Sequence, residues 1–139
     1  MFCADLSILV LGLSSEEEDI WLLIRTIRDP EHPYTLAQLR VVSPKFVKYE
    51  ISLNTIIIQF EPTIPNCSLS SVIGLCIREK ILRNYYSDPP YRLVVKLVEG
   101  SHENYESINK QLIDKERVAA ALENPDVSRI LRNCIDDVY

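Results

Sequence analysis

The sequence predicts a two-layer α/β (α+β) domain in which helices cover a small mixed sheet. The first observation is an apolar stretch over residues 55–61, whose run of isoleucines is typical of a buried strand. The second is a helical pattern that begins at Ser68, and the third is another apolar stretch over residues 91–98. A strand, a helix and a strand in this order predict one β–α–β crossover.

An amphipathic helix is predicted over residues 16–28, ahead of the sheet. Ser15 followed by Glu18 fits a capping box, and the acidic residues beside Glu18 suit the first turn of a helix. Four apolar residues then share one face: Ile20, Leu23, Ile24 and Ile27. Pro30 ends the helix, because the residue before a proline avoids the helical conformation.

A short extended segment over residues 40–43 is expected to lead into a β-hairpin. Its strands are residues 46–51 and 55–61, with a turn at residues 52–54. The second strand contains three consecutive isoleucines instead of an alternating pattern, which predicts that both of its faces are covered.

The helix that begins at Ser68 presents an apolar stripe made of Leu69, Val72, Ile73 and Cys76. The C-terminal third, residues 105–137, is predicted to be helical and charged, with an interruption at Asn124-Pro125. There Asn124 is expected to cap a last helix, with Pro125 at its first position.

Length and charge narrow the classes of function. The 139 residues suffice for one domain with a substantial core, which is expected over residues 16–139. Residues 1–15 are expected to form an arm that is disordered or covered by a partner, and their apolar stretch is too short to span a membrane. The net charge of −5, with basic residues scattered among acidic ones, argues against nucleic acid as a ligand.

The cysteines are spread along the chain without a Cys-X-X-Cys pair: Cys3, Cys67, Cys76 and Cys134. This spacing excludes the usual zinc-ribbon and thioredoxin patterns and does not resemble a secreted disulfide framework. We therefore expect a reducing, intracellular compartment. Cys76 lies about 13 Å along the helix from Cys67 at 1.5 Å per residue, on the apolar stripe, and is expected to pack in the core.

Cys67 and His102 form the candidate site. A loop containing Pro62 and Pro65 delivers Cys67 to the start of a helix, where unpaired N–H groups and the helix dipole favour the thiolate. His102 follows the strand over residues 91–98, and parallel strands would bring the two residues to one edge of the sheet. Such a pair suits a nucleophile with its base, or two ligands of a soft metal. Each residue also has a reading without chemistry, as a buried helix-start thiol and a surface-loop histidine.

Three stretches of the sequence resemble one eukaryotic family. They are IRTIRDPEHPYTL at residues 24–36, FEPTIPNCSLSSVIGLCI at residues 60–77 and INKQLIDKERVAAALENP at residues 108–125. The short EGSH at residues 99–102 also fits. The family is the cytosolic iron–sulfur assembly component of the targeting complex, which is related to bacterial SufT- and PaaD-like domains. The resemblance covers nearly the whole chain.

The resemblance implies an iron–sulfur-cluster-assembly-type fold and a non-enzymatic adaptor function. Such an adaptor bridges a WD-repeat propeller protein and a large HEAT-repeat adaptor, and helps to deliver clusters to cytosolic and nuclear apoprotein clients. The resemblance implies no firmly bound cofactor, but a transient iron–sulfur cluster or divalent metal. It also implies a homodimer, domain-swapped in some members, and a cytoplasmic location that extends to the nucleus.

Particular residues take on roles through the same resemblance. The family's reactive cysteine falls on Cys67, its loop histidine on His102, and its turn motif on Asp29-Pro30-Glu31. Contacts with a metal or cluster are expected from Cys67, His102 and Glu31. Animal members carry histidine directly before the reactive cysteine, where this chain has Asn66, and this weakens the case for a metal.

A second hypothesis keeps the chemistry within this chain alone. In it the protein is a stand-alone thiol enzyme, or a carrier of metal or clusters. Cys67 is then the nucleophile or a ligand, and His102 is the base or the second ligand. The sequence offers no obvious third catalytic residue for such a site.

Overall fold

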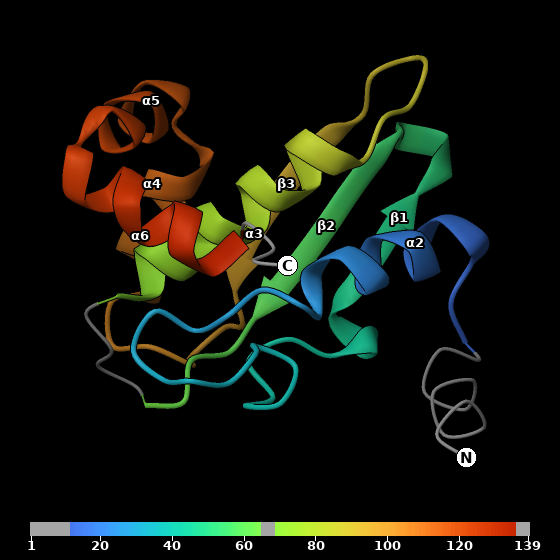
Figure 1. Ribbon diagram of the computed structural model, residues 1–139. Helices are drawn as coiled ribbons and strands as arrows, with labels where there is room; N and C mark the ends of the chain where they lie inside the picture. The colour runs from blue at the N-terminus through green and yellow to red at the C-terminus, as the bar shows by residue number, and fades with distance from the viewer. Residues whose placement is uncertain (1–11, 65–68, 136–139) are drawn as a thin grey trace.

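The computed structural model describes residues 12–64 and 69–135. A three-stranded sheet with the order β1-β2-β3 lies at its centre (Figure 1). Strands β1 (Val47–Glu50) and β2 (Thr55–Phe60) are antiparallel, whereas β2 and β3 (Arg92–Leu97) are parallel. Helix α3 (Ser70–Asn84) connects the parallel pair, so the predicted mixed sheet with a β–α–β crossover is confirmed.

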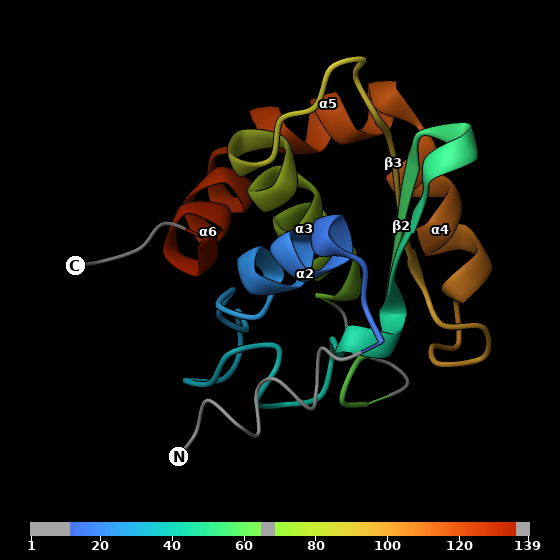
Figure 2. The same ribbon diagram turned by 90° about the vertical axis from the view of Figure 1, so that its right-hand side faces the viewer.

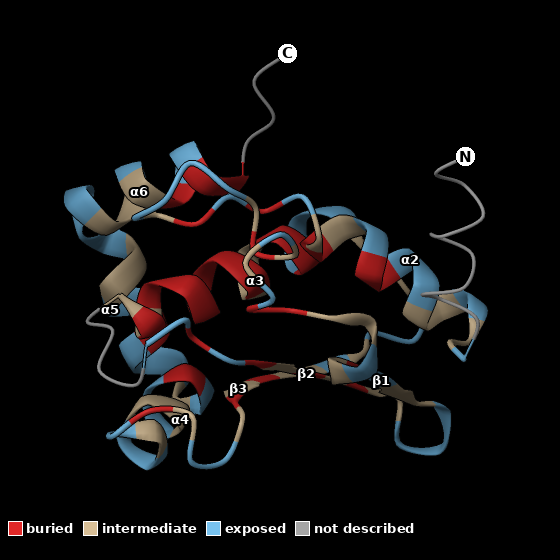
Figure 3. Cartoon of the chain, turned by 90° about the horizontal axis from the view of Figure 1, so that it is seen from below, coloured by how far each residue is buried: buried red, intermediate tan, exposed pale blue. Residues whose placement is uncertain are grey.

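The helices lie on both faces of this sheet. Helices α2 (Ser15–Ile24), α3 and α6 (Pro125–Ile135) lie on one face, whereas α4 (Tyr105–Ile113) lies on the other, beside β3 (Figure 2). The short helix α5 (Lys115–Glu123) joins α4 to α6. Buried residues concentrate on α3 and on the side of α2 and α6 that faces it (Figure 3). Every helix in the described ranges is too short or too polar to cross a membrane.

Helix α2 begins one residue earlier than predicted and ends four residues earlier. Ser14, not Ser15, is the N-cap: its Oγ accepts the N–H of Glu17 at 3.2 Å, and Glu17 Oε1 accepts the N–H of Ser14 at 2.9 Å. The second oxygen of Glu17 accepts the N–H of Tyr49 at 2.8 Å, which ties the capping box to β1. This contact with a distant strand selects Ser14 over its neighbour.

Helix α2 ends at Ile24 because backbone groups beyond it form hydrogen bonds with other segments. The N–H of Arg28 donates to the carbonyl of Cys134 on α6 at 3.0 Å, and Arg28 also forms an isolated antiparallel bridge with Thr35. Ile27 remains buried although it lies beyond the helix. The apolar pattern therefore predicted the burial of Ile27 correctly, whereas the helix end expected from Pro30 is wrong.

The segment over residues 40–43 is not a strand, so that prediction is wrong. Arg40 adopts a left-handed conformation with φ of 61°, and the N–H of Val41 donates back to Leu36 at 2.9 Å. The carbonyl of Val41 accepts the N–H of Glu61 at 2.8 Å, at the end of β2. Val41 and Val42 are buried by a sequence of turns instead of by a strand.

The hairpin between β1 and β2 forms as predicted, but the two faces of β2 are not equally buried. Its turn contains a short 3₁₀ segment, Ile51–Leu53, and closes on Asn54 with φ of 47°. Ile56 and Ile58 are fully buried, whereas Ile57 is only half-buried. The expectation that both faces are covered is therefore wrong for Ile57, because α4 packs on β3 at the second face.

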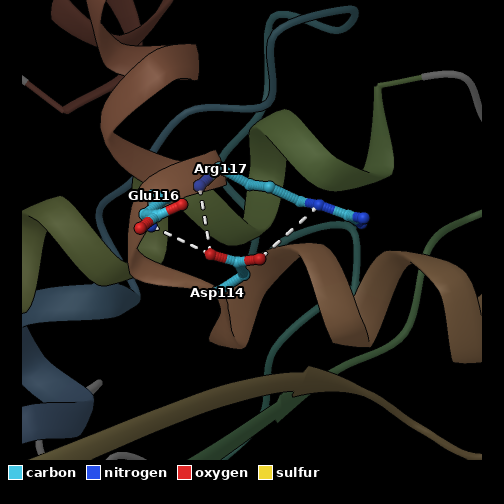
Figure 4. A network of polar contacts seen from close by, with 3 residues as sticks. All are labelled: Asp114, Glu116 and Arg117. Atoms are coloured by element: carbon cyan, nitrogen blue, oxygen red, sulfur yellow. Dashed lines mark hydrogen bonds and ion pairs between the residues drawn. The ribbon is translucent and has the colours of Figure 1, made fainter.

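The C-terminal third is helical, as predicted, and contains a break that the sequence pattern does not show. Asp114 ends α4 and caps α5, accepting the N–H groups of Glu116 at 2.9 Å and Arg117 at 3.3 Å (Figure 4). The predicted interruption is confirmed: Asn124 Oδ1 accepts the N–H of Asp126 at 2.9 Å, and Pro125 is the first residue of α6.

Candidate functional site

The carboxyl ends of β2 and β3 lie at the same edge of the sheet, as predicted. Phe60 is paired with Leu97, and the N–H of Val98 donates to the carbonyl of Phe60 at 3.0 Å. The two loops that leave these strands therefore start side by side, which is the geometry assumed for Cys67 and His102. Cys67 lies outside the described residues, so its approach to His102 stays a prediction.

His102 lies in the loop between β3 and α4 and is buried, with 6% of its surface exposed. Its Nδ1 accepts the N–H of Asn104 at 2.9 Å, and its carbonyl accepts the N–H of Tyr105 at 3.2 Å. A neutral imidazole that accepts at Nδ1 carries its proton on Nε2. The ring is therefore held in one orientation, unlike an ordinary surface-loop histidine.

Gly100 allows this loop to turn. Its φ of +78° is a left-handed conformation that glycine adopts without a steric penalty. The following residue, Ser101, donates from both its N–H and its hydroxyl to the carbonyl of Val98, at 3.0 and 2.6 Å. These bonds fold the loop back toward the end of β3 and position His102 at the sheet edge.

The Asp29-Pro30-Glu31 motif forms a tight turn organised by Asp29. One carboxylate oxygen, Oδ1, accepts the N–H of Glu31 at 2.7 Å and that of His32 at 3.1 Å. The N–H of Asp29 donates to the carbonyl of Tyr34 at 2.9 Å, and only 7% of the residue is exposed. Asp29 is thus committed to the turn, whereas Glu31 is exposed.

The predicted metal or cluster contacts were Cys67, His102 and Glu31. Within residues 12–64 and 69–135, no three His, Cys, Asp or Glu side chains come together in a group suited to a metal ion. The structure thus places Glu31 and His102 individually without joining them in such a group. Their contact with a metal or cluster, together with Cys67, stays a prediction.

Cys76 belongs to the core, as predicted. It is fully buried on α3 and shares a side-chain hydrogen bond with Cys134 of α6, which is 5% exposed. That hydrogen bond and the burial raise the pKa of the Cys76 thiol far above its ordinary value. A thiol of this kind is protonated and shielded, so Cys76 has no part in the candidate site.

Two polar residues that the sequence patterns do not single out hold the helices in place. Lys80 is buried on α3, and its Nζ donates to the carbonyl of Ile135 at the end of α6, at 3.1 Å. Asn109 of α4 accepts the N–H of Leu97 through Oδ1 at 2.7 Å. The only sequence signal for either was a charged residue within an otherwise apolar helical face, at Lys80.

Comparison with known proteins identifies the family. The chain is 48% identical over 117 residues to Protein AE7-like 1 of Arabidopsis thaliana, covering 84% of this chain and 75% of that protein. It is 45% identical over 120 residues to MIP18 family protein galla-2 of Drosophila melanogaster, covering 86% and 76%. The chain belongs to the MIP18 family.

MIP18 family membership confirms the resemblance seen in the sequence. The mouse relative named Cytosolic iron-sulfur assembly component 2B is 41% identical over 122 residues, covering 88% of this chain and 74% of that protein. The matched region is long enough to include the sheet and most of the helices around it. No family model matches the chain.

Proposed function

We propose that this MIP18 family protein is a non-enzymatic adaptor of cytosolic iron–sulfur cluster assembly. In this role it acts within a targeting complex that helps to deliver clusters to cytosolic and nuclear apoproteins. The observation that carries the proposal is the 41% identity to mouse Cytosolic iron-sulfur assembly component 2B over 88% of this chain. The cluster is cargo in this account, and the chain holds no resident cofactor.

The described part of the site supports an adaptor better than an enzyme. The carboxylate of Asp29 already accepts two backbone N–H groups, and Nδ1 of His102 accepts one from Asn104. These groups fix loop shapes at the surface of the domain. Cys67 would be the residue that contacts the cluster, because a thiolate is a soft ligand that suits iron–sulfur clusters. In an adaptor this contact would be transient.

The proposed partners are a WD-repeat propeller protein, a HEAT-repeat adaptor and apoprotein clients. The proposed location is the cytoplasm and the nucleus, and the proposed oligomer is a homodimer. The exposed Glu31 on a turn held rigidly by Asp29 is a suitable feature for partner recognition.

Affinity purification from cells tests the proposal. The tagged chain should recover a propeller protein and a HEAT-repeat protein in near-equal amounts. Glu31→Lys should reduce that recovery, whereas Lys48→Glu, an exposed change of charge on β1, should not. Recovery of neither partner by the unmodified chain would contradict the adaptor function.

A further inference from the structure

Strand β3 is an edge strand, and one of its sides faces away from the sheet. On the inner side, the N–H of Arg92 donates to Asn54 at 2.9 Å and that of Val98 donates to Phe60 at 3.0 Å. Because backbone groups alternate in direction along a strand, the N–H and C=O groups of Leu93, Val95 and Leu97 point to the outer side. An unpaired strand edge is a template for another strand.

In the part of the chain that the structure describes, one end of this edge is closed and the other is not. Asn109 of α4 accepts the outward N–H of Leu97 at 2.7 Å, which satisfies the carboxyl end of the strand. Among the described residues, no side chain forms such a bond with the N–H of Leu93 or Val95. Within residues 12–64 and 69–135, the amino-terminal half of the edge is therefore open for pairing.

A groove of about 740 Å³ runs along this open half. Residues 92–95 of β3 form one side, α3 contributes Leu82, and the end of α4 contributes Ile113. Leu82 is 45% exposed and Ile113 is 60% exposed, although both are large and apolar. They provide apolar contacts for the side chains of an added strand.

The groove is positively charged, in contrast to the chain as a whole. Arg78, Arg92 and Lys115 line it, and among the residues that the structure describes no carboxylate does. In the described ranges none of these three cations forms an ion pair, and Nε of Arg78 is buried without a hydrogen-bond partner. Nearby cations differ: Arg117, for example, pairs with Asp114 at 3.6 Å (Figure 4). Unpaired cations gathered in a chain of net charge −5 favour an acidic ligand.

We propose that this groove binds an extended acidic segment of a partner protein, which adds to β3 as a fourth strand. The main chain of the segment would pair with Leu93 and Val95, as in other cases of strand addition. Its acidic side chains would meet Arg78, Arg92 and Lys115. This surface is distinct from the loops that carry His102 and Asp29, so the inference stands independently of the proposed function.

The test uses the full chain and two defined probes. One is an eight-residue peptide that alternates glutamate with valine, and the other has lysine in place of glutamate. The acidic peptide should bind at least about tenfold more tightly than the lysine peptide, and added salt should weaken its binding. It should also shift the amide NMR signals of Leu93 and Val95. Equal binding of both peptides, or no shift at these amides, would overturn the proposal.

Variants separate charge from strand pairing. Arg92→Glu should weaken the acidic peptide about tenfold, whereas Arg132→Glu, an equal change at an exposed position on α6, should leave binding within about twofold. Leu93→Pro removes an outward N–H without removing a bond to β2, and should abolish binding. If Leu93→Pro unfolds the chain, the Arg92→Glu and Arg132→Glu pair still decides the matter: equal effects contradict the proposal.

Hydrogen exchange identifies other occupants of the edge. Before any peptide is added, the amides of Leu93 and Val95 should exchange faster than those of Val94 and Lys96, which face β2. Protection of the outer amides in the free protein would show that another part of this chain covers the edge. Protection that appears only at high protein concentration would show a second copy. Either result contradicts the proposed partner.

Discussion

Cys76 of α3 and Cys134 of α6 share a side-chain hydrogen bond inside the core. The same junction is crossed by Lys80, which donates to the carbonyl of Ile135 at 3.1 Å, and α6 also accepts the N–H of Arg28 through Cys134. These contacts join α3, α6 and the turn that begins at Asp29. The position of that turn therefore depends on the packing of α6.

Because of this thiol pair, the free energy of unfolding is expected to depend on pH in the alkaline range. The shared hydrogen bond and burial raise the pKa of Cys76 in the folded state, whereas the unfolded thiols ionise near their ordinary value of 9.0. Well above pH 9, the unfolded chain has released both protons and the folded pair has released at most one. The folded state then binds more protons, so the free energy of unfolding falls as pH rises.

Urea unfolding under reducing conditions at pH 7.5, 9 and 10 measures this effect. Above pH 9, the loss in the free energy of unfolding should approach about 1.4 kcal/mol per pH unit for one thiol. Cys76→Ser should show a shallower pH dependence because it lacks the thiol. The same slope in both proteins would contradict the pKa assignment.

Gly74 allows α3 to approach α4 and β2 closely. A Cβ at this position would lie 2.6 Å from Leu112 Cδ1 and 3.2 Å from Phe60 Cζ. Gly74→Ala should therefore lower the free energy of unfolding by about 1–3 kcal/mol, although alanine normally favours a helix. Leu112→Ala should lower the free energy of unfolding less in the Gly74→Ala protein than in the unmodified chain. A stabilising Gly74→Ala would contradict the close approach.

Within the Asp29-Pro30-Glu31 motif, we expect Asp29 to be needed for stability and Glu31 not to be. Asp29→Ala leaves the N–H groups of Glu31 and His32 without their acceptor and should cost about 1–2 kcal/mol of stability. Asp29→Asn retains an acceptor and should cost much less. Glu31→Ala should leave stability within about 0.5 kcal/mol, because the side chain is exposed. Thermal unfolding of the three variants is the measurement, and a loss at Glu31 equal to that at Asp29→Ala would refute this division.

The layout of the sheet was predictable because it depends on patterns within short segments. The isoleucines of β2, the apolar stripe of α3 and the strand that follows are each visible in the sequence. The start of α2 was not, because Ser14 with Glu17 and Ser15 with Glu18 have the same spacing. The bond from Glu17 to the N–H of Tyr49, 32 residues away, decides between them.

The site was predictable in topology but not in environment. The predicted parallel strands correctly put the carboxyl ends of β2 and β3 at one sheet edge, whereas the position of Cys67 stays a prediction. The burial of His102 and its bond to Asn104 depend on how the loop folds after Gly100, which no periodic pattern encodes. The open edge of β3 was equally hidden, because it depends on two features of the described residues: β3 is the last strand of their sheet, and Asn109 bonds the edge at Leu97.

Cluster content of client proteins in cells tests the central claim most directly. The cells are depleted of this protein and complemented with the unmodified chain, with Cys67→Ser, or with Cys3→Ser as a matched control. We expect normal client clusters with the unmodified chain and with Cys3→Ser, and a loss of clusters with Cys67→Ser while the partner proteins are still recovered. Normal client clusters in the depleted cells without complementation would contradict a role in iron–sulfur assembly.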